Sequence, residues 1–362
     1  MGLVIIADDL TGALDSAAPF CRDLGELEIE FHTSRVPSSN TVYVVPTRDQ
    51  TPDAAMAMMS AAFSQFAGAD LAFKKIDSLL RGHWAGELAQ IMHTGLFERV
   101  ILAPAFPQLG RITRNGVLFL RTSAEDCSVS GHDVAAKLQG LGLSFATVPP
   151  GGALKGMATE VLLCDAENEA HLERIVVEGR ALEGRTLWCG SGGLANALAG
   201  GPAHTIKKFS KVGLAIVGSH HCVMRRQIED FNDGHPERQV IVNEDIELAS
   251  NEIARRIATA GSALVTFIVP DGTGAREAAT LIESRIRLLV PHLQQPGFLF
   301  ASGGETLMSI CKATSADGLS VFGQLLPGMP VSRIKSGLWA GTTIVSKSGA
   351  FGDQSTLTDL LR

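Results

Sequence analysis

The first fifteen residues of the chain hold the pattern that decides the fold. A short apolar run, Gly2-Leu3-Val4-Ile5-Ile6-Ala7, is followed directly by Asp8-Asp9-Leu10-Thr11-Gly12-Ala13-Leu14-Asp15. Six small or apolar residues that end at two acids are typical of a buried strand. Residues 15–24 then predict a helix that starts near Asp15 or Ser16. A buried strand followed by a helix is the first part of a βαβ unit.

The same alternation continues along the chain. Further strands are predicted over 41–45, 71–75, 100–103, 160–164 and 186–189, with helices over 52–66, 86–94 and 167–182. A second series of strands is predicted over 212–217, 239–242, 262–267, 297–301 and 342–346. This rhythm predicts an α/β protein of two domains, each a mostly parallel sheet flanked by helices. Residues 199–211 are small and polar with a basic run, so we expect domains over 1–205 and 206–362.

Composition excludes several classes of protein. The 362 residues are 45% hydrophobic and carry 31 basic against 38 acidic residues, a net charge of -7 with a single Tyr. This balance argues against a nucleic-acid backbone as partner. No apolar stretch approaches the ~18 residues of a membrane span, and the start lacks a basic leader. We therefore expect a cytoplasmic protein with neither nucleic acid nor membrane as partner, and its scattered cysteines to be reduced.

Two candidate motifs lie at the ends of early strands. Asp8 and Asp9 stand where ligands bind in open α/β sheets, so one of them could accept a hydroxyl proton or bind hydroxyls. Capping of the next helix by Asp9 or Thr11 is the alternative interpretation, and the residues alone leave both open. After the strand 71–75 come Lys74, Lys75 and Arg81, a concentration of positive charge that favours an anionic substrate over a merely solvated loop.

A third stretch, residues 103–113, has two prolines and a glycine after a strand, which predicts a stiff loop that presents Arg111 and Thr113. Such a loop can hold a substrate, but it can equally be a simple crossover, which the residues alone favour.

Three turns in the second half could hold phosphate. Each follows a predicted strand and contains glycine or small residues, which leave backbone N–H groups accessible to an anion. Taken together they indicate a nucleotide site, although each alone is a routine turn. The residues are Gly218 and Ser219, then Gly303, Gly304, Glu305 and Thr306, and finally Lys347 and Gly349.

Other signatures are absent or weak. The chain contains no G-x-x-x-x-G-K-[ST], so it is not a P-loop enzyme. Residues 190–195 imitate a dinucleotide fingerprint but lack the acid ~20 residues on, which favours packing or an extra ligand turn. His220, His221 and Cys222 are adjacent and lack a spaced partner, so no zinc site is expected.

Six segments, in this order, resemble the four-carbon acid sugar kinase family. They are ADDLTGALD (7–15), KKIDSLLRGH (74–83), APAFPQLGR (103–111), SGGET (302–306), LLPGMP (325–330) and KSGAFG (347–352). The resemblance spans essentially the whole chain. It implies a kinase that uses ATP and Mg²⁺ on a four-carbon sugar acid such as threonate, erythronate or 3-oxo-tetronate. It also implies an N-terminal sugar-acid-binding domain and a C-terminal nucleotide-binding domain that is not a P-loop fold, with the reaction in the cleft between them.

Site residues follow from the same resemblance. It implies Asp8 and Asp9 as catalytic residues, one of them taking the hydroxyl proton. The implied substrate-binding residues are Lys75, Asp77, Arg81 and Arg111. The implied ATP-binding residues are Ser219, Gly303, Gly304, Glu305, Thr306 and Gly349, and Lys347 is added to them as the cation of the last turn. The resemblance suggests no resident metal ligand, and it leaves a homodimer open.

Departures from the family pattern keep other functions under consideration. Leu79 and His83 replace the usual Thr and Asn, and the stretch after Arg111 is shorter than usual. A sugar-acid sensor without turnover is therefore the first alternative. An NAD-dependent oxidoreductase, which rests on residues 190–195 alone, is the second.

Overall fold

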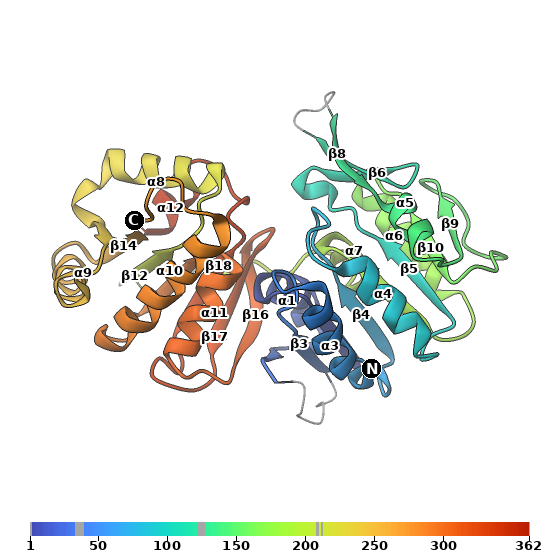
Figure 1. Cartoon of the computed structure of the whole chain (residues 1–362), viewed down its shortest axis with the longest axis horizontal. Coiled ribbons are helices and arrows are strands. Elements are labelled where there is room, and N and C mark those ends of the chain that lie inside the picture. Colours follow the sequence, from blue (N-terminus) through green and yellow to red (C-terminus); the bar gives the residue numbers. More distant parts are fainter. Residues whose placement is uncertain (1, 33–39, 122–126, 208–209, 211–212, 362) are drawn as a thin grey trace. The chain divides into compact units, whose positions relative to one another are not determined.

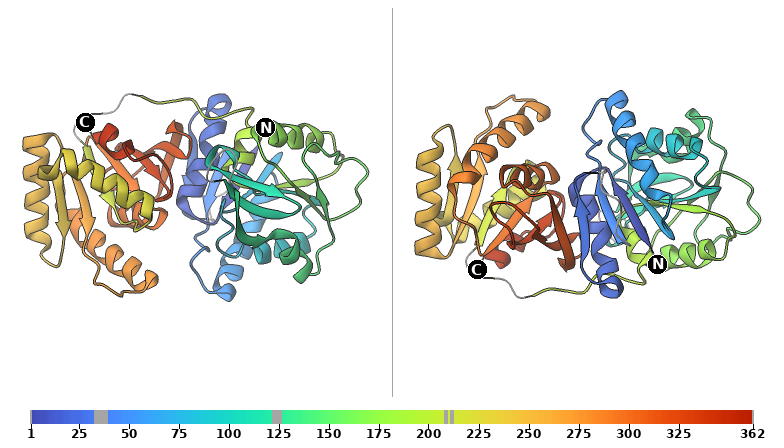
Figure 2. Two further views of the ribbon diagram at one scale, coloured as in Figure 1. Left: turned by 90° about the horizontal axis from the view of Figure 1, so that it is seen from above. Right: turned by 90° about the horizontal axis from the view of Figure 1, so that it is seen from below.

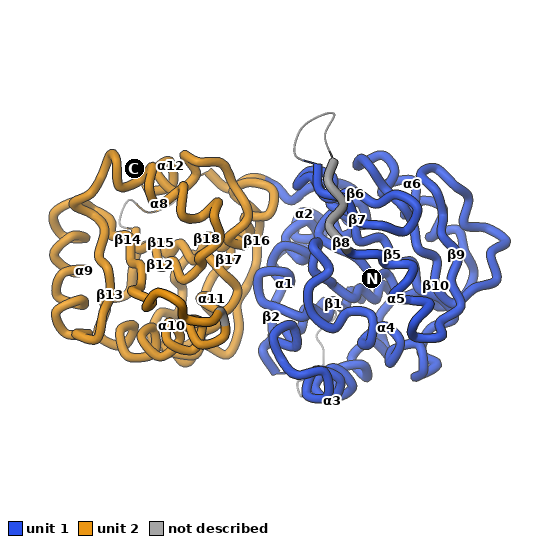
Figure 3. The backbone as a smooth tube through the Cα atoms, turned by 45° about the horizontal axis from the view of Figure 1, so that its top comes forward, with its two compact units in different colours: residues 1–204 blue, residues 205–362 orange. Residues whose placement is uncertain are grey.

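The computed structural model describes residues 2–32, 40–121, 127–207, 210 and 213–361 (Figure 1). The chain divides into two compact units, Met1–His204 and Thr205–Arg362 (Figure 3). In the described chain, no helix has the length and apolar character needed to cross a bilayer.

The first unit is built on a parallel sheet. Its strands run in the order β2-β3-β1-β4-β11-β5-β10-β9, and each neighbouring pair is parallel. The central strand β1 is buried along its whole length, as its continuous apolar run predicts. The strands are β1 (Leu3–Ala7), β2 (Leu27–Glu30), β3 (Asn40–Val44), β4 (Leu71–Lys75), β5 (Arg99–Ala103), β9 (Phe145–Val148), β10 (Val161–Cys164) and β11 (Thr186–Gly190).

Helices cover both faces of this sheet (Figure 1, Figure 2). They are α1 (Leu10–Ala17), α2 (Cys21–Leu24), α3 (Pro52–Ala62), α4 (Trp84–His93), α5 (Val134–Gly140), α6 (Glu169–Arg180) and α7 (Gly192–Leu198). On one face α1 packs against α7, which in turn packs against α6; on the other, α3 packs against α4. Val4 and Ile6 of β1 belong to the apolar core beneath α3 and α4, together with Met59 and Leu88.

A small antiparallel sheet stands beside the parallel one. Its strands β6 (Arg111–Arg114), β7 (Val117–Arg121) and β8 (Cys127–Asp133) pair in that order. Arg111 and Thr113 therefore lie on a strand, and the prediction of a loop that presents both is wrong. Thr113 is buried, and its Oγ1 accepts a hydrogen bond from the Ala166 N–H at 2.9 Å.

The second unit has its own sheet, in the order β13-β14-β12-β15-β18-β17-β16. The pairs up to β18 are parallel, and β18, β17 and β16 pair antiparallel. Its strands are β12 (Gly213–Val217), β13 (Gln239–Val242), β14 (Ser262–Phe267), β15 (Phe298–Ser302), β16 (Gly318–Leu326), β17 (Met329–Ile334) and β18 (Thr343–Lys347). Its helices are α8 (Cys222–Gly234), α9 (Ile246–Ala260), α10 (Ala275–Leu289), α11 (Gly304–Ala313) and α12 (Thr356–Leu361). Here α8 packs against α12, whereas α10 packs against α9 and α11.

The architecture confirms the predicted α/β class, with a mostly parallel sheet flanked by helices in each unit. The helix predicted to start near Asp15 is wrong at its beginning, because α1 starts at Leu10. Asp9 caps it: the Asp9 Oδ1 accepts a hydrogen bond from the Gly12 N–H at 2.9 Å. A 3₁₀ turn, Ala18–Phe20, and α2 then carry the chain on to Leu24.

Candidate active site

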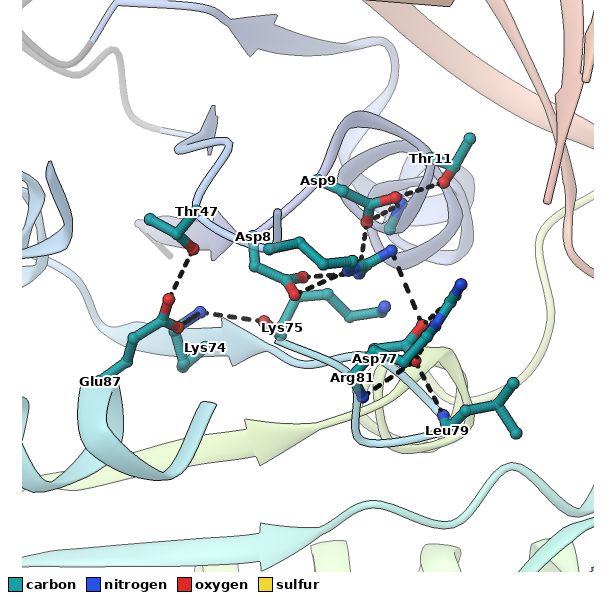
Figure 4. A network of polar contacts seen from close by, with 12 residues as sticks. Asp8, Asp9, Thr11, Thr47, Lys74, Lys75, Asp77, Leu79, Arg81 and Glu87 are labelled. Carbon is teal, nitrogen blue, oxygen red and sulfur yellow. Dashed lines mark hydrogen bonds and ion pairs between the residues drawn. The ribbon is translucent and has the colours of Figure 1, made fainter. Parts of the chain in front are cut away.

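Charged side chains gather where three neighbouring strands of the first unit end. Asp8 and Asp9 follow β1, Lys75 ends β4, and Asp77 comes two residues later (Figure 4). Arg48 enters from the loop after β3, which pairs with β1. Since parallel strands end at one edge of the sheet, the fold brings these groups together at the edge where α/β proteins bind ligands.

Arg48 is the centre of this group, and the sequence analysis did not single it out. Its guanidinium donates from Nε to Asp8 Oδ2 at 3.0 Å and from Nη2 to Asp8 Oδ1 at 2.8 Å. The same Nη2 donates to Asp9 Oδ1 at 2.8 Å, and Nη1 lies 3.7 Å from Asp77 Oδ1. The Arg48 side chain is only 11% exposed and Asp8 only 3%. One buried cation therefore joins three carboxylates.

The two aspartates differ in what they do. Asp9 caps α1 and also accepts a hydrogen bond from the Thr11 hydroxyl at 2.6 Å. Burial would raise the pKa of Asp9, but Arg48 and Lys75 outweigh it and hold that pKa below its usual value. Burial raises the pKa of Asp8, against the opposing charge of Arg48. The capping interpretation thus holds for Asp9, whereas Asp8 is the carboxylate that attracts a proton more strongly.

The two lysines at the end of β4 point to opposite faces of the sheet, as consecutive strand residues must (Figure 4). Lys74 is fully buried and forms an ion pair with Glu87 of α4 at 2.8 Å, while Thr47 donates to the other Glu87 oxygen at 2.5 Å. Lys74 is therefore neutralised, so the expectation that both lysines offer charge to an anion is wrong for this one. Lys75 lies on the α1 face, where its ammonium comes close to Gly12.

Asp77 organises the loop that carries Arg81. Its Oδ2 accepts hydrogen bonds from the Leu79 and Arg81 N–H groups, at 3.2 and 3.3 Å, and from Arg81 Nε at 2.8 Å. Arg81 Nη2 donates to Asp77 Oδ1 at 2.9 Å, and the Arg81 side chain remains 54% exposed. Leu80, between them, has φ 59, a left-handed conformation that a leucine adopts only where its surroundings impose it. Asp77 thus holds Arg81 as a partly exposed, fixed guanidinium.

Arg111 completes the positive side of the group. Burial lowers the pKa of Arg111, and the charge of Asp77 opposes that shift. The charge of Arg81 acts in the same direction as burial, so Arg111 lies within electrostatic reach of both residues. The structure therefore brings Asp8, Asp9, Lys75, Asp77, Arg81 and Arg111 into one neighbourhood.

In the second unit, the three predicted turns come together at the ends of β12, β15 and β18, which are neighbours in the sheet. A Cβ on Gly349 would collide with the Ser219 hydroxyl, and one on Gly218 would collide with the Thr306 hydroxyl. Gly303 has φ 105, a conformation open to glycine, and precedes the first residue of α11, Gly304. Glu305 follows and is exposed. The turns therefore approach one another so closely that only glycine fits at Gly218 and Gly349, and backbone without side chains lies next to the start of α11.

Lys347 lies inside the second unit rather than on the surface of these turns. It is fully buried, and its ammonium donates to the Phe351 carbonyl at 2.9 Å. Burial lowers the pKa of Lys347 to about 7. Gln227 donates to the same carbonyl at 3.1 Å and to that of Asp353 at 2.7 Å. Lys347 and Gln227 together hold the loop that follows Gly349.

Two patterns from the sequence have structural explanations. In the Gly190–Gly193 turn, a Cβ on Gly193 would lie 2.6 Å from the Ala105 carbonyl oxygen and one on Gly190 would collide with that of Ala103, which supports the packing interpretation. His221 caps α8 by accepting from the Val223 N–H at 3.2 Å. Within the described ranges, no group of three or more His, Cys, Asp or Glu side chains is arranged to hold a metal ion.

Comparison with known proteins shows to which protein family the chain belongs. Residues 3–138 match a family of sugar-binding N-terminal domains, and residues 214–357 match a family of nucleotide-binding C-terminal domains. Together the two matches take in more than three quarters of the chain. The chain belongs to the four-carbon acid sugar kinase family.

Curated relatives resemble the chain over most of its length. A D-threonate kinase from Cupriavidus necator is 29% identical over 99% of this chain and 96% of its own. A D-erythronate kinase from Heliobacterium modesticaldum is 26% identical, over 97% and 94%. A 3-oxo-tetronate kinase from Brucella melitensis is 25% identical, over 71% and 69%.

Solved structures share the fold. A protein from Salmonella typhimurium LT2 superposes with a TM-score of 0.77 at 19% identity, over 99% of this chain and 98% of its own. A protein from Haemophilus influenzae gives a TM-score of 0.69 at 18% identity, over 99% and 100%.

Arg48 is the residue that sequence reasoning missed at this site. A signal was present, because Arg48 stands a few residues after the strand predicted over 41–45, just as Asp8 and Asp9 follow theirs. It lies outside the six family-like segments, and a single arginine after a proline and a threonine carries little weight by itself.

Proposed function

We propose that this protein is an ATP-dependent kinase that phosphorylates a hydroxyl group of a four-carbon sugar acid. The observation that carries the proposal is that similarity to kinases of three such acids extends through both units of the chain. The charged group at the strand ends of the first unit supports it, because a small polyhydroxy acid needs both cations and hydrogen-bond acceptors.

In this proposal the first unit binds the sugar acid. Arg81 and Lys75 hold the substrate carboxylate, and Arg111 adds positive charge nearby. Arg81 suits this task because Asp77 fixes its guanidinium while about half of the side chain stays exposed. The ammonium group of Lys75 is buried against α1, so little water screens its attraction to the substrate carboxylate.

Asp8 is the better of the two aspartates for accepting the hydroxyl proton. Its raised pKa makes it the stronger base, whereas Asp9 is engaged by the α1 N-terminus and Thr11. Arg48 donates one hydrogen bond to each Asp8 oxygen. Because a carboxylate oxygen can accept more than one hydrogen bond, Asp8 can still accept one from the substrate hydroxyl. The hydroxyl oxygen forms the bond to the γ-phosphorus, its proton passes to Asp8, and ADP leaves.

The second unit binds ATP in the same proposal. The turns at Ser219, Gly303–Thr306 and Gly349 supply backbone N–H groups for the phosphates, and Lys347 supports the loop beside them. The described acidic side chains do not form a metal site, and Arg48 fills the space among the carboxylates of the first unit. We therefore propose that Mg²⁺ enters bound to the ATP phosphates and has no resident site.

The test is ATP consumption by the purified protein with a panel of acids: D- and L-threonate, D- and L-erythronate and 3-oxo-tetronate. We expect turnover with at least one acid, and nuclear magnetic resonance of the product identifies the phosphorylated hydroxyl. The control is the Asp8→Asn variant, which should still bind ATP but turn over at least ~10²-fold more slowly. Folded protein that binds ATP but turns over none of these acids would refute the kinase and favour a sugar-acid sensor.

A further inference from the structure

A second pair of charged groups lies on the α1 face of the first unit, and none of the roles above uses Asp15. Asp15 and Gly12 are three residues apart on α1 and so lie on the same side of the helix. A Cβ on Gly12 would lie 2.9 Å from Lys75 Nζ, and a Cβ on Gly192 would collide with Asp15 Oδ2. Two bare glycines, one at the start of α1 and one at the start of α7, thus make room for an ammonium and a carboxyl group.

Neither group is satisfied within the protein. Lys75 is only 4% exposed, yet among the described residues its ammonium has no hydrogen-bond or ion-pair partner, and the same is true of the Asp15 carboxyl group. Each nevertheless feels the other: burial raises the pKa of Asp15 to about 6, and the charge of Lys75 opposes that shift while Asp9 adds to it. A buried ammonium and a half-buried carboxyl group that the described residues leave without a hydrogen bond are both free to pair with a polar ligand.

From this geometry we propose that Asp15 and Lys75 form a subsite that recognises one hydroxyl of the sugar acid. Asp15 accepts the hydrogen bond of that hydroxyl, and Lys75 donates to an oxygen of the same ligand. The proposal rests on the proposed function and deepens it, since it assigns a specificity-determining residue to the same substrate. A carboxylate that pairs with a substrate hydroxyl disfavours an analogue without that hydroxyl, because the half-buried Asp15 acceptor then loses its donor.

The test measures by calorimetry, on the full-length protein, how tightly the wild type and the variant Asp15→Asn bind each of four ligands. The ligands are whichever of threonate and erythronate the wild type binds best and its three deoxy analogues: 2,3-, 2,4- and 3,4-dihydroxybutanoate. We expect Asp15→Asn to weaken binding of the tetronate about 10- to 100-fold, as for one hydrogen bond to a charged group. For the analogue that lacks the contacted hydroxyl, the same substitution should change affinity by less than about threefold. Asp23→Asn, at an exposed position of α2, is the matched control and should leave all affinities unchanged.

The outcomes separate this inference from the kinase itself. If Asp15→Asn weakens all four ligands equally, or none, the subsite is wrong while the kinase stands. If the wild type binds neither threonate, erythronate nor 3-oxo-tetronate, the proposed function and the subsite fail together. Should Asp15→Asn not fold, Asp15→Ser, which also removes the carboxylate, gives the same set of measurements. Equal loss for the tetronate and every analogue would then overturn the hydroxyl contact.

Discussion

Replacing Arg48 tests whether one buried cation holds the three carboxylates of the first unit. Arg48→Met keeps the unbranched stem but removes two hydrogen bonds to Asp8, one to Asp9 and the charge 3.7 Å from Asp77. These carboxylates are largely buried, so the variant leaves uncompensated charge inside the protein. Breaking one side of such a buried pair costs about 3–5 kcal/mol of unfolding free energy, and we expect a loss in that range at pH 7.

The loss should depend on pH in a defined direction. Without Arg48, the pKa of Asp8, already raised by burial, rises further. A carboxyl group whose pKa is higher in the folded than in the unfolded state binds its proton more tightly when folded, so it favours folding at low pH. The deficit of the variant relative to the wild type should therefore shrink as the pH falls from 7 to about 5.

Native-state hydrogen exchange of the β1 and β4 amides measures the unfolding free energy of the first unit alone. Arg114→Met is the matched control in the same unit, because Arg114 pairs with Glu167 at 2.6 Å but is 44% exposed. An exposed pair contributes at most about 1 kcal/mol. If Arg48→Met costs no more than this control, or if its deficit grows as the pH falls, the central role of Arg48 is wrong.

Three further predictions concern the two proposed sites. Gly349→Val should weaken ATP binding more than about tenfold in calorimetry and spare sugar-acid binding, because its side chain collides with Ser219; Gly234→Ala, with open space around it, is the control, and an unchanged ATP affinity for Gly349→Val would contradict the site. Arg81→Ala should lower kcat/KM for the acid ~10²-fold, a loss of roughly 2–4 kcal/mol, with ATP binding intact; loss of ATP binding alone would reverse the proposed division between the units. Burial lowers the pKa of Lys347 to about 7, below its unfolded value, so the native state binds this proton less tightly and stability should rise from pH 7 towards 10. Lys347→Met should flatten that rise in urea unfolding, and a profile as steep as that of the wild type would show that another group causes it.

Local sequence determined most of the parallel strands and their order along the chain, whereas β2, β9, β16 and β17 were not predicted. Runs such as residues 2–7 and 100–103 are apolar enough to be buried on both faces, and burial on both faces is what a central parallel strand requires. The start of α1 was misplaced because Leu10-Thr11-Gly12 reads as a turn. The Asp9 cap, which satisfies the Gly12 N–H, makes the same residues the first turn of a helix.

The strands β6–β8 escaped prediction for another reason. β6 and β7 are short, and the proline and glycine residues before Arg111 favour a loop. Their pairing is what makes them strands, and pairing between segments depends on tertiary structure more than on local preference. The same pairing buried Thr113, which the sequence pattern had placed in an exposed loop.

At the candidate site, the sequence by itself determined which kinds of group are present, and the tertiary structure decided which of them meet. Polar residues that follow buried strands must lie at one edge of a parallel sheet, so Asp8, Asp9 and Lys75 could be found from the pattern alone. Only the strand order β3-β1-β4 brings Arg48 between those carboxylates. Only the approach of α4 to one face of β4 neutralises Lys74, while Lys75 on the other face has no ion pair among the described residues. Hydrogen bonds and ion pairs form only when their atoms come within a few ångströms of each other. These partners are far apart along the chain, and only folding makes them neighbours.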